Sequence, residues 1–406
     1  MKQKKILLLG GSAQQLVAIR AAKELGFYTV LCDYLPDNPG QYEVDIFYQV
    51  STTDVDAVYE VAMKEQVDGI LAYASDPASL SAAVVSERMH LPTNSVKSVE
   101  ILGLKHPWRN FLKNNGFSSP KSITFHPTIG TDDLKKLVCN FTFPIVIKPT
   151  DSSGSKGVTV LDNMDNVSTA IQWADTYSRN KVLIAEEYIT RGFPNVIGGD
   201  IFVWDGKIVL YGEMACLRDL DNSPLIPIGK KYPGGLNEKQ KNRVHSELQR
   251  VVDILNIRFG EMNIEIILDK DDNVHFLELG PRAGGNMIPV QLSDIFSIDL
   301  VKANVQAAMG IEPDFVRSPI IAGDGCFMHY VLHSYQEGKF QGVSINESVE
   351  QFIYRKVIYK AIGDSVEVFD GAGKAIGIIF LHFNTEEQME YFCTHHNQLV
   401  KIKLKP

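Results

Sequence analysis

The segment 263–286, NIEIILDKDDNVHFLELGPRAGGN, constrains this chain more than any other. Glu265 lies between two isoleucines and Glu278 between two leucines, on what read as neighbouring hydrophobic strands. Because side chains alternate along a strand, both acids face away from those apolar neighbours. Carboxylates that share a face repel each other unless cations lie between them. The segment therefore predicts a hairpin that binds hard divalent cations.

Arg282 follows Glu278 by four residues. A guanidinium at that distance can hold an anion beside the cations, or it can simply neutralise the two acids. Both interpretations stay open at the level of the sequence.

Length and composition limit the remaining choices. A chain of 406 residues is too long for one core, so two to four domains are expected. The net charge of −9 and the absence of a Lys/Arg-rich block argue against nucleic-acid binding. No apolar run approaches the length of a membrane span, and we interpret the start MKQKKILLLGG as a first strand. Five scattered cysteines without CxxC spacing indicate a reducing, cytoplasmic location.

The first ~110 residues alternate between predicted strands and helices, which is typical of a doubly wound, Rossmann-like α/β domain. Strands are expected at 5–9, 28–33, 45–50 and 69–75, and helices at 54–66 and 77–89. The first turn, GGSAQQ, lacks the third glycine of a dinucleotide fingerprint, so an NAD site is not favoured.

Three polar or flexible positions lie at the carboxyl ends of these strands, where ligands of such sheets bind. We predict that Gly11, Ser12 and Asp76 contact a small substrate. The alternative is that the glycine only makes a tight turn and that Asp76 only caps the helix beginning at Pro77.

The pattern changes after a predicted helix at 105–116. Residues 120–188 read as a small α+β module of a size to act as a lid. Residues 189–310 are β-rich, with helices expected at 237–256 and 291–309. The final segment, 311–406, is predicted to be a separate small β-rich domain.

A strand, a flexible loop and a second strand occupy IVIKPTDSSGSKGVTVL. Lys148 ends a buried strand, where an uncompensated ammonium is costly, so an anion such as a nucleotide phosphate is expected beside it. The loop can turn backbone N–H groups toward phosphate oxygens, unless it is a mere connection. The loop residues predicted to bind ATP are Ser153, Gly154, Ser155, Lys156 and Gly157.

The strand LIAEEYI ends in two adjacent acids, which must point in opposite directions. An outward acid can accept a hydrogen bond from an adenine amino group or a ribose hydroxyl. The backbone of Tyr188 and Ile189 could read the adenine edge. The alternative is a solvated strand end.

In this order, the KxxxR helix with Lys105, the IVIKP strand, the SSGSKGV loop, EEYI, FLELGPR and GGN resemble the landmarks of the ATP-grasp superfamily. The resemblance runs from about residue 5 to 310. It implies a pre-ATP-grasp domain at 1–110 and an ATP-grasp domain at 111–310. In the latter, about 120–188 would be the mobile lid and about 189–310 the metal-binding and catalytic part.

The resemblance also implies roles for individual residues. Lys105 and Lys148 would contact ATP phosphates, and Arg282 the acyl phosphate. Glu186 and the backbone of Tyr188 would hold adenine, and Glu187 or a later acid the ribose. Glu265 and Glu278 would bind Mg²⁺, or Mn²⁺ in its place.

Two departures from the family pattern stand out. Gly280 replaces a metal-binding Asn, a role that Asn263, Asn286 or water could take. Where the family has an acid after the EEYI hinge, this chain offers Asn195 or Asp200.

The branch most similar to this chain joins a carboxylate to an amine at the expense of ATP, which implies small-molecule substrates and allows a homodimer. Gly11, Ser12, Asp76, Gly285 and Asn286 would then line the acceptor pocket. Two alternatives stay open: carboxyphosphate chemistry with bicarbonate, and an ATP-binding regulatory protein that has lost catalysis.

Overall fold

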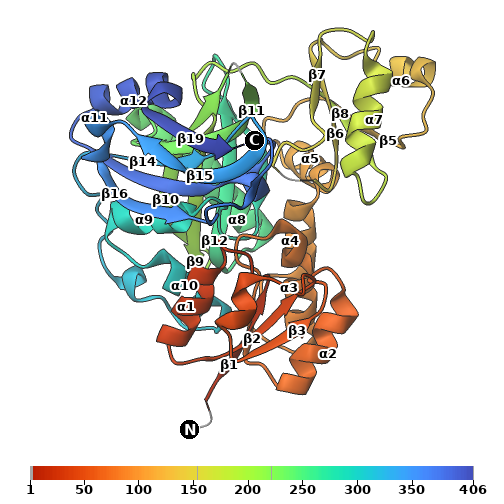
Figure 1. The fold of residues 1–406 in the computed structure, drawn as a ribbon. Helices are drawn as coiled ribbons and strands as arrows, with labels where there is room; N and C mark the ends of the chain where they lie inside the picture. Colours follow the sequence, from red (N-terminus) through yellow and green to blue (C-terminus); the bar gives the residue numbers. More distant parts are fainter. Residues whose placement is uncertain (1–2, 153, 221, 406) are drawn as a thin grey trace.

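The computed structural model describes residues 3–152, 154–220 and 222–405. Figure 1 shows a helix-flanked N-terminal part, a small lobe that projects from the rest, and a large β-rich part that carries the C-terminus. The predicted fold class, α/β followed by α+β, is confirmed.

The N-terminal part is built on a parallel sheet in the order β3-β2-β1-β4. Strand β1 is buried because Ile6, Leu7, Leu8 and Leu9 are all apolar and at most 2% exposed. Since β1 and β4 are neighbours, the segments after them lie at one edge of the sheet. The elements are β1 (Lys5–Leu9), α1 (Leu16–Glu24), β2 (Tyr28–Asp33), η1 (Pro39–Tyr42), β3 (Ile46–Gln49), α2 (Val55–Glu65), β4 (Gly69–Leu71) and α3 (Asp76–Arg88).

Two helices lead away from this part, α4 (Val96–Gly103) and α5 (Lys105–Asn114). Helix α5 was predicted, but α4 was not. Its start is fixed by Ser95, whose hydroxyl accepts a hydrogen bond from the backbone N–H of Ser98.

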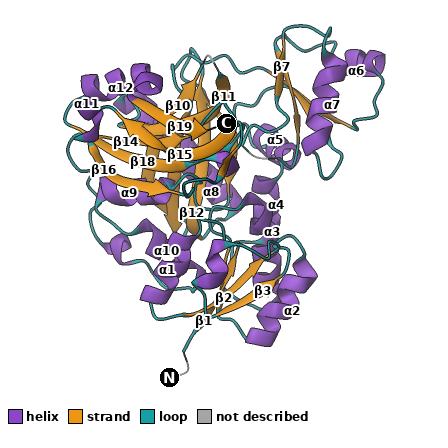
Figure 2. Ribbon diagram, viewed as in Figure 1, coloured by secondary structure: helices purple, strands orange, loops and turns teal. Residues whose placement is uncertain are grey.

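The projecting lobe is an antiparallel sheet in the order β5-β8-β6-β7, with two helices against it (Figure 2). Its own small core includes Ile145, Ile147, Leu183 and Ala185. The elements are β5 (Ser122–Phe125), α6 (Thr131–Leu137), β6 (Ile145–Pro149), β7 (Thr159–Leu161), α7 (Val167–Tyr177) and β8 (Leu183–Glu187).

An eight-stranded sheet in the order β13-β12-β9-β10-β11-β14-β18-β16 forms the largest part. One half of this sheet comprises β9 (Ile197–Trp204), β10 (Lys207–Asp219), β11 (Ser223–Tyr232), β12 (Phe259–Leu268) and β13 (Val274–Gly280). Helix α8 (Glu238–Leu255) buries Val244, Leu248 and Val251 in the core beside this half.

The single helix predicted at 291–309 is wrong. The chain forms α9 (Ile288–Phe296) and α10 (Leu300–Ala308) instead. Ser297 adopts a left-handed conformation with φ of 53°, which ends α9. The Asp299 side chain then caps α10 by accepting from the N–H of Lys302.

The C-terminal segment is β-rich, as expected, but part of it continues the large sheet. Strand β14 pairs with β11, and β18 and β16 follow, while β17, β15 and β19 form a separate three-stranded sheet. The elements are η2 (Asp314–Arg317), β14 (Cys326–Leu332), β15 (Gly338–Ile345), α11 (Glu347–Glu350), β16 (Ile353–Ile358), β17 (Ser365–Val366), η3 (Ala372–Lys374), β18 (Gly377–Phe383), α12 (Glu386–Leu399) and β19 (Val400–Lys405).

None of the helices in the described ranges is long and apolar enough to cross a membrane.

Candidate active site

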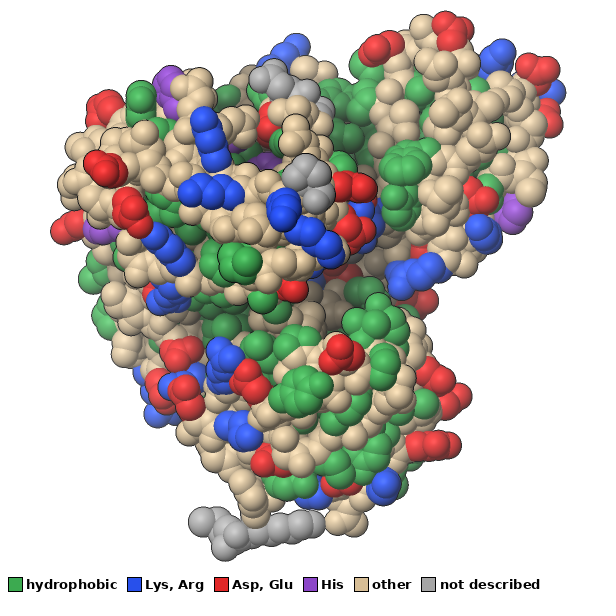
Figure 3. Space-filling view, in the orientation of Figure 1, with side chains coloured by type: hydrophobic (Ala, Val, Ile, Leu, Met, Phe, Trp, Pro, Cys, Tyr) green, Lys and Arg blue, Asp and Glu red, His purple; other side chains and the backbone are tan. Residues whose placement is uncertain are grey.

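A cavity of about 250 Å³ lies between the projecting lobe and the large sheet. Figure 3 shows the molecule hollowed between the lobe and the remainder, with charged side chains around the hollow. Most of the ATP and metal positions expected from the sequence meet at this cavity: Lys105, Lys148, Gly154, Ser155, Lys156, Glu186, Glu187, Tyr188, Ile189, Glu265 and Glu278. Residues from five separate segments of the chain thus surround one space.

The two metal-binding candidates are cross-strand partners. Strands β12 and β13 form the expected hairpin, and Glu265 lies directly opposite Glu278 in its register. On the other side of β12, Glu265 is opposite Gly198 of β9. The hairpin therefore brings both carboxylates to one face beside the cavity, which the alternation of apolar neighbours predicted.

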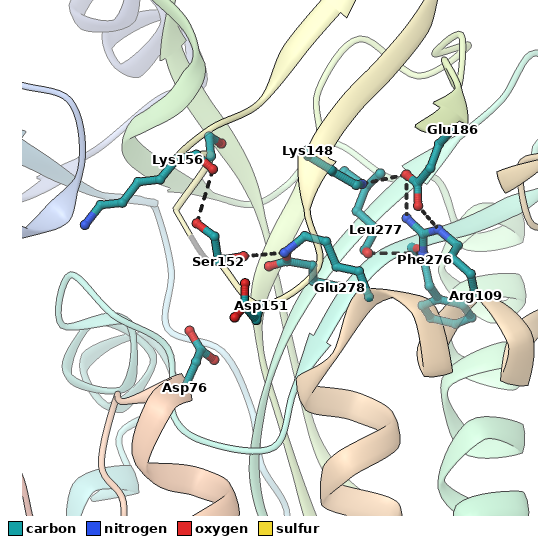
Figure 4. A network of polar contacts seen from close by, with 12 residues as sticks. Asp76, Arg109, Lys148, Asp151, Ser152, Lys156, Glu186, Phe276, Leu277 and Glu278 are labelled. Carbon is teal, nitrogen blue, oxygen red and sulfur yellow. Dashed lines mark hydrogen bonds and ion pairs between the residues drawn. The ribbon is translucent and has the colours of Figure 1, made fainter. Parts of the chain in front are cut away.

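Lys148 belongs to a buried charge cluster on the lobe side of the cavity (Figure 4). Its Nζ lies 2.5 Å from Oε2 of Glu186, whose Oε1 accepts from Nε of Arg109 at 2.8 Å. Burial lowers the pKa of Lys148, and Glu186 opposes that effect. Burial would raise the pKa of Glu186, but Arg109 and Lys148 lower it to about 2, so Glu186 is ionised.

This cluster differs from the role implied for Glu186. Its carboxylate is engaged by two cations rather than turned to an adenine amino group, because β8 places it between β6 and helix α5. Arg109, which also donates to the backbone oxygen of Phe276 at 2.9 Å, ties the lobe to β13.

Lys105, at the start of α5, bridges the cavity floor and the glycine loop. Its Nζ lies 2.9 Å from Oε1 of Glu278 and also donates to the backbone oxygen of Ser152. Glu278 is thus the counter-charge of this ammonium at the cavity.

Arg282 is held by Asp76 of the N-terminal part. Its Nε and Nη2 donate to the two oxygens of Asp76, both at 2.7 Å. Asp76 was predicted as a substrate contact, and this bidentate pair joins it to the loop that follows β13. A Cβ added at Gly280 would lie 3.3 Å from both Arg282 Cζ and Asp76 Oδ1. The Arg282–Asp76 pair therefore leaves little room at position 280 for the Asn side chain that the family commonly has there.

The first glycine turn and the GGN loop meet at the edge of the N-terminal sheet. Gly11 N–H donates to Asp33 at 2.7 Å, and Ser12 N–H donates to Gln15 at 2.9 Å. The backbone N–H of Asn286 donates to Oε1 of Gln14 at 2.7 Å, and Gly285 lies beside the same oxygen. The carboxylate of Asp33 therefore accepts hydrogen bonds from the backbone N–H groups of Gly11 and Leu35, and it is not free to bind the ribose of a dinucleotide.

The glycine loop curls through left-handed backbone conformations at Gly154, Ser155 and Gly157, with φ of 67°, 61° and 73°. The Ser155 hydroxyl donates to the backbone oxygen of Leu225 at 3.0 Å, which joins the loop to the β10–β11 hairpin. Gly157 is not among the cavity-lining residues, and Ser153 lies outside the described residues.

The acids and amides after the hinge fall in different places. Glu187 lines the cavity, but its Oε1 accepts from the backbone of Thr142 at 2.8 Å. Asn195 is not among the lining residues, whereas Val196 is. Asp200 is fully buried and faces the 281–286 loop, where its Oδ2 accepts from the N–H of Gly284, and it is not among the cavity-lining residues.

One basic residue near the site was missed in the sequence, whereas Arg109, the arginine of the KxxxR helix, was recognised there without a role of its own. Lys230 on β11 is only 5% exposed, and its Nζ lies 3.2 Å from Cys216 Sγ. A Cβ at Gly198 would be 2.0 Å from that Nζ, so the lysine reaches across to the strand beside Glu265. A signal existed: Lys230 continues the apolar alternation of Ile226 and Ile228.

The donor set fits a cation that keeps some of its water and phosphate ligands. No group of three or more His, Cys, Asp and Glu side chains that could hold a metal occurs in the part of the chain that the structure describes. Glu265 and Glu278 supply two carboxylates, which suits Mg²⁺ bound partly through substrate phosphates. Asn263 is held through its Nδ2, which donates to Asp200 and to the backbone oxygen of Gly199, so only its Oδ1 could serve as a metal ligand.

Comparison with known proteins places this geometry in a family. Residues 109–314, about half of the chain, match the model of the carbamoyl-phosphate synthase L chain, ATP binding domain. The chain belongs to this family, and the expected membership of the ATP-grasp superfamily is confirmed.

Individual relatives are distant. The chain is 21% identical over 328 residues to a carbamoyl phosphate synthase large chain of Pseudothermotoga lettingae, covering 76% of this chain and 28% of that one. It is 25% identical to a formate-dependent phosphoribosylglycinamide formyltransferase of a Synechococcus species, covering 68% of this chain and 69% of the other. The chain thus spans little more than a quarter of the synthase relative's length.

Solved structures match over the whole chain. An L-amino acid ligase from Bacillus licheniformis has a TM-score of 0.82 at 19% identity, and a phosphoribosylglycinamide synthetase from Anaerococcus prevotii has 0.78 at 18%. Both comparisons cover 100% of each chain. At these identities the likeness establishes the fold.

Proposed function

We propose that this protein is an ATP-dependent ligase that activates a carboxylate as an acyl phosphate and joins it to an amine. One observation carries the proposal: Lys105, Lys148, Glu265, Glu278 and the glycine loop border a single cavity. Phosphoryl transfer needs groups of these kinds. The two lysines would offset phosphate charge, the backbone N–H groups of the loop would donate to phosphate oxygens, and the two carboxylates would bind a metal.

In the first step a substrate carboxylate oxygen attacks the γ-phosphorus of ATP. The bond from that phosphorus to the β–γ bridging oxygen breaks, and ADP leaves with the electron pair. Lys105 and Lys148 offset phosphate charge during the transfer. Mg²⁺ held by Glu265 and Glu278 would supply further charge neutralisation, and Mn²⁺ could take its place. The backbone of Tyr188 and Ile189 would face the adenine.

In the second step the amine nitrogen attacks the acyl carbon. Phosphate leaves with the electrons of the C–O bond, and the nitrogen loses a proton, so the products are an amide, ADP and phosphate. Arg282 stabilises the oxyanion of the tetrahedral intermediate. For this, its guanidinium has to turn part of its hydrogen bonding from Asp76 to the substrate.

The substrates expected here are small molecules. Gly11 and Ser12, Asp76, and Gly285 and Asn286 come from three segments: the turn after β1, the start of α3 and the 281–286 loop. Hydrogen bonds join the last of these to each of the other two, which supports their assignment to the acceptor pocket. Pairing of two copies into a homodimer stays a prediction, as does a cytoplasmic location.

A second candidate has specific support. The matching family model and one relative described above are named for carbamoyl phosphate synthase, so bicarbonate could be the acid in place of an organic carboxylate. The same phosphoryl transfer would then give carboxyphosphate.

A screen for ADP release tests both candidates. Wild-type protein with Mg²⁺ and ATP is incubated with paired acids and amines, and with bicarbonate alone or with each amine. ADP release that requires an organic acid and an amine together supports the ligase; release with bicarbonate and no other acid supports the second candidate.

Glu278→Gln is the matched test of the site. It should abolish ADP release, because it removes one metal-binding carboxylate and the partner of Lys105. Glu238→Gln is the control, since Glu238 lies on α8 with its side chain 82% exposed. Equal loss in both variants, or ADP release that Glu278→Gln leaves intact, would contradict the proposal.

A further inference from the structure

Two further carboxyl groups share the sheet face of Glu265. Glu261, Asn263 and Glu265 alternate along β12, so they point to one side. Asp200 of β9 is the cross-strand neighbour of Asn263. Asp200 is 0% and Glu261 3% exposed, because the 281–286 loop folds over them.

Asp200 holds this loop from below. Its Oδ2 accepts from the N–H of Gly284 at 2.8 Å, and its Oδ1 accepts from Nδ2 of Asn263 at 2.7 Å. The backbone N–H of Asn263 in turn donates to the oxygen of Arg282 at 3.0 Å. The loop is therefore anchored to β12 at the backbone oxygen of Arg282 and to β9 two residues later, at the N–H of Gly284.

Glu261 completes the arrangement by sharing a proton with Asp200. Burial and the Asp200 charge raise the pKa of Glu261 well above its usual value. Glu261 thus keeps its proton and donates to Asp200, while Nδ2 of Asn304 donates to Glu261 Oε2. The pair carries one negative charge, which faces Arg282.

Gly284 is fitted closely to this pair. A Cβ added there would lie 2.6 Å from Asp200 Oδ1 and 2.7 Å from Ile288 Cδ1. A side chain at this position would have to lift the loop away from the sheet, and Arg282 with it.

We propose that Asp200 is a positioning residue: together with Glu261 it fixes the 281–286 loop, so that Arg282 stands at a set distance from Glu265 and Glu278. The inference rests on the proposed function for its effect on turnover. Its structural part, the fixing of the loop, stands independently. Displacement of a catalytic group by about 1 Å can cost about 100-fold in rate.

Asp200→Asn tests the proposal in the full chain. The amide keeps the shape but presents a donor to either Gly284 N–H or Asn263 Nδ2. Hydrogen exchange should show the Gly284 amide exchanging about tenfold faster, as expected for loss of a hydrogen bond to a charged group. With the substrates from the ADP-release screen, kcat should fall about 10- to 100-fold while the KM for ATP changes by less than about threefold.

Glu261 offers a test by conservative replacement. Glu261→Gln keeps a donor toward Asp200 and an acceptor for Asn304, whereas Glu261→Met removes both. The Gln variant should keep the slow exchange at Gly284, and the Met variant should lose it.

Gly284→Ala is the second route, because it moves the loop and leaves both acids in place. It should reproduce the exchange change and the fall in kcat. Gly373→Ala is the matched control, since nothing lies within 4 Å of a Cβ there.

Unchanged exchange at Gly284 in Asp200→Asn, or a loss of kcat matched by the loss of ATP affinity, would overturn the proposal. Absence of any productive substrate pair for the wild type would overturn the proposed function alone, since the exchange result is obtained without turnover.

Discussion

Arg282 and Asp76 are joined by two hydrogen bonds of 2.7 Å, although they lie on the 281–286 loop and at the edge of the N-terminal sheet, respectively. Lys105 and Lys148 are likewise paired with Glu278 and Glu186. Each of these three cations therefore has a carboxylate partner. Bound substrates have to compete with these partners, and this shapes the predictions below.

Asp76→Asn should lower kcat about 10- to 100-fold, because Arg282 loses the group that orients it. The KM for ATP should change by less than about threefold, since Asp76 does not line the ATP cavity. Steady-state ADP release checks this. Asp56→Asn is the control, because Asp56 makes an exposed ion pair with Arg88 in the same part of the chain. Equal effects of the two substitutions would contradict the orienting role.

Glu186→Gln should destabilise the fold by about 3–5 kcal/mol at pH 7, since it leaves Arg109 and Lys148 buried without their shared counter-charge. Urea unfolding of both proteins measures the difference.

The pH dependence follows from the sign of the shift. The pKa of Glu186 is about 2 in the folded protein and near 4.5 when unfolded, so its contribution is complete above pH 4.5 and is lost between pH 4.5 and 2. The difference in the free energy of unfolding between wild type and Glu186→Gln should therefore become smaller as the pH falls from 4.5 to 2. A gap independent of pH would show that Glu186 is not the ionised partner.

Glu261→Gln should behave in the opposite way. The folded pKa of Glu261 lies well above its unfolded value, so the wild type takes up a proton on folding and loses stability as pH rises above about 4.5. The variant has no such proton, so its stability relative to wild type should rise by up to about 1.4 kcal/mol per pH unit in that range. Thermal unfolding of both proteins at pH 4.5, 6 and 8 measures this trend. A stability difference that stays the same at all three pH values would refute the shared proton.

Lys230→Met should affect the ligand-free and ATP-bound proteins differently. The ammonium is buried with the Cys216 thiol as its neighbour, so its removal should leave the free protein about as stable or more stable. Because the lysine reaches the strand beside Glu265, ATP–Mg²⁺ affinity should fall at least about tenfold if it serves a phosphate. Melting temperatures with and without ATP report both effects. Lys207→Met, at an exposed position on β10, is the control.

Unbroken apolar runs and regular alternation explain why much of the fold was predictable from the sequence. Runs such as KILLL and YTVLCD fix β1 and β2 to the residue, and the Glu265–Glu278 hairpin follows from apolar neighbours on both strands. The break at Ser297 was not predictable, because it depends on one left-handed residue and a cap at Asp299 inside an otherwise helical pattern.

The site was less predictable where partners come from distant segments. Lys148 was expected beside an anion, and that anion is the carboxylate of Glu186, which also pairs with Arg109. In the sequence, Glu186 follows Lys148 by 38 positions and Arg109 precedes it by 39. Asp76 and Arg282 are 206 positions apart, so no local pattern could reveal their contact. Local sequence identifies which groups are available; packing of the parts decides which groups pair.

The hydrogen bonds between β11 and β14 have a practical consequence for protein engineering. Residues 229–232 pair with 327–330, so cutting the chain near position 311 would strip one side of β11 and leave an open strand edge. Such a truncation should aggregate, and it would also release the strand that carries Lys230. Chimeras that exchange tails between homologues should therefore keep β11 and β14 from the same parent.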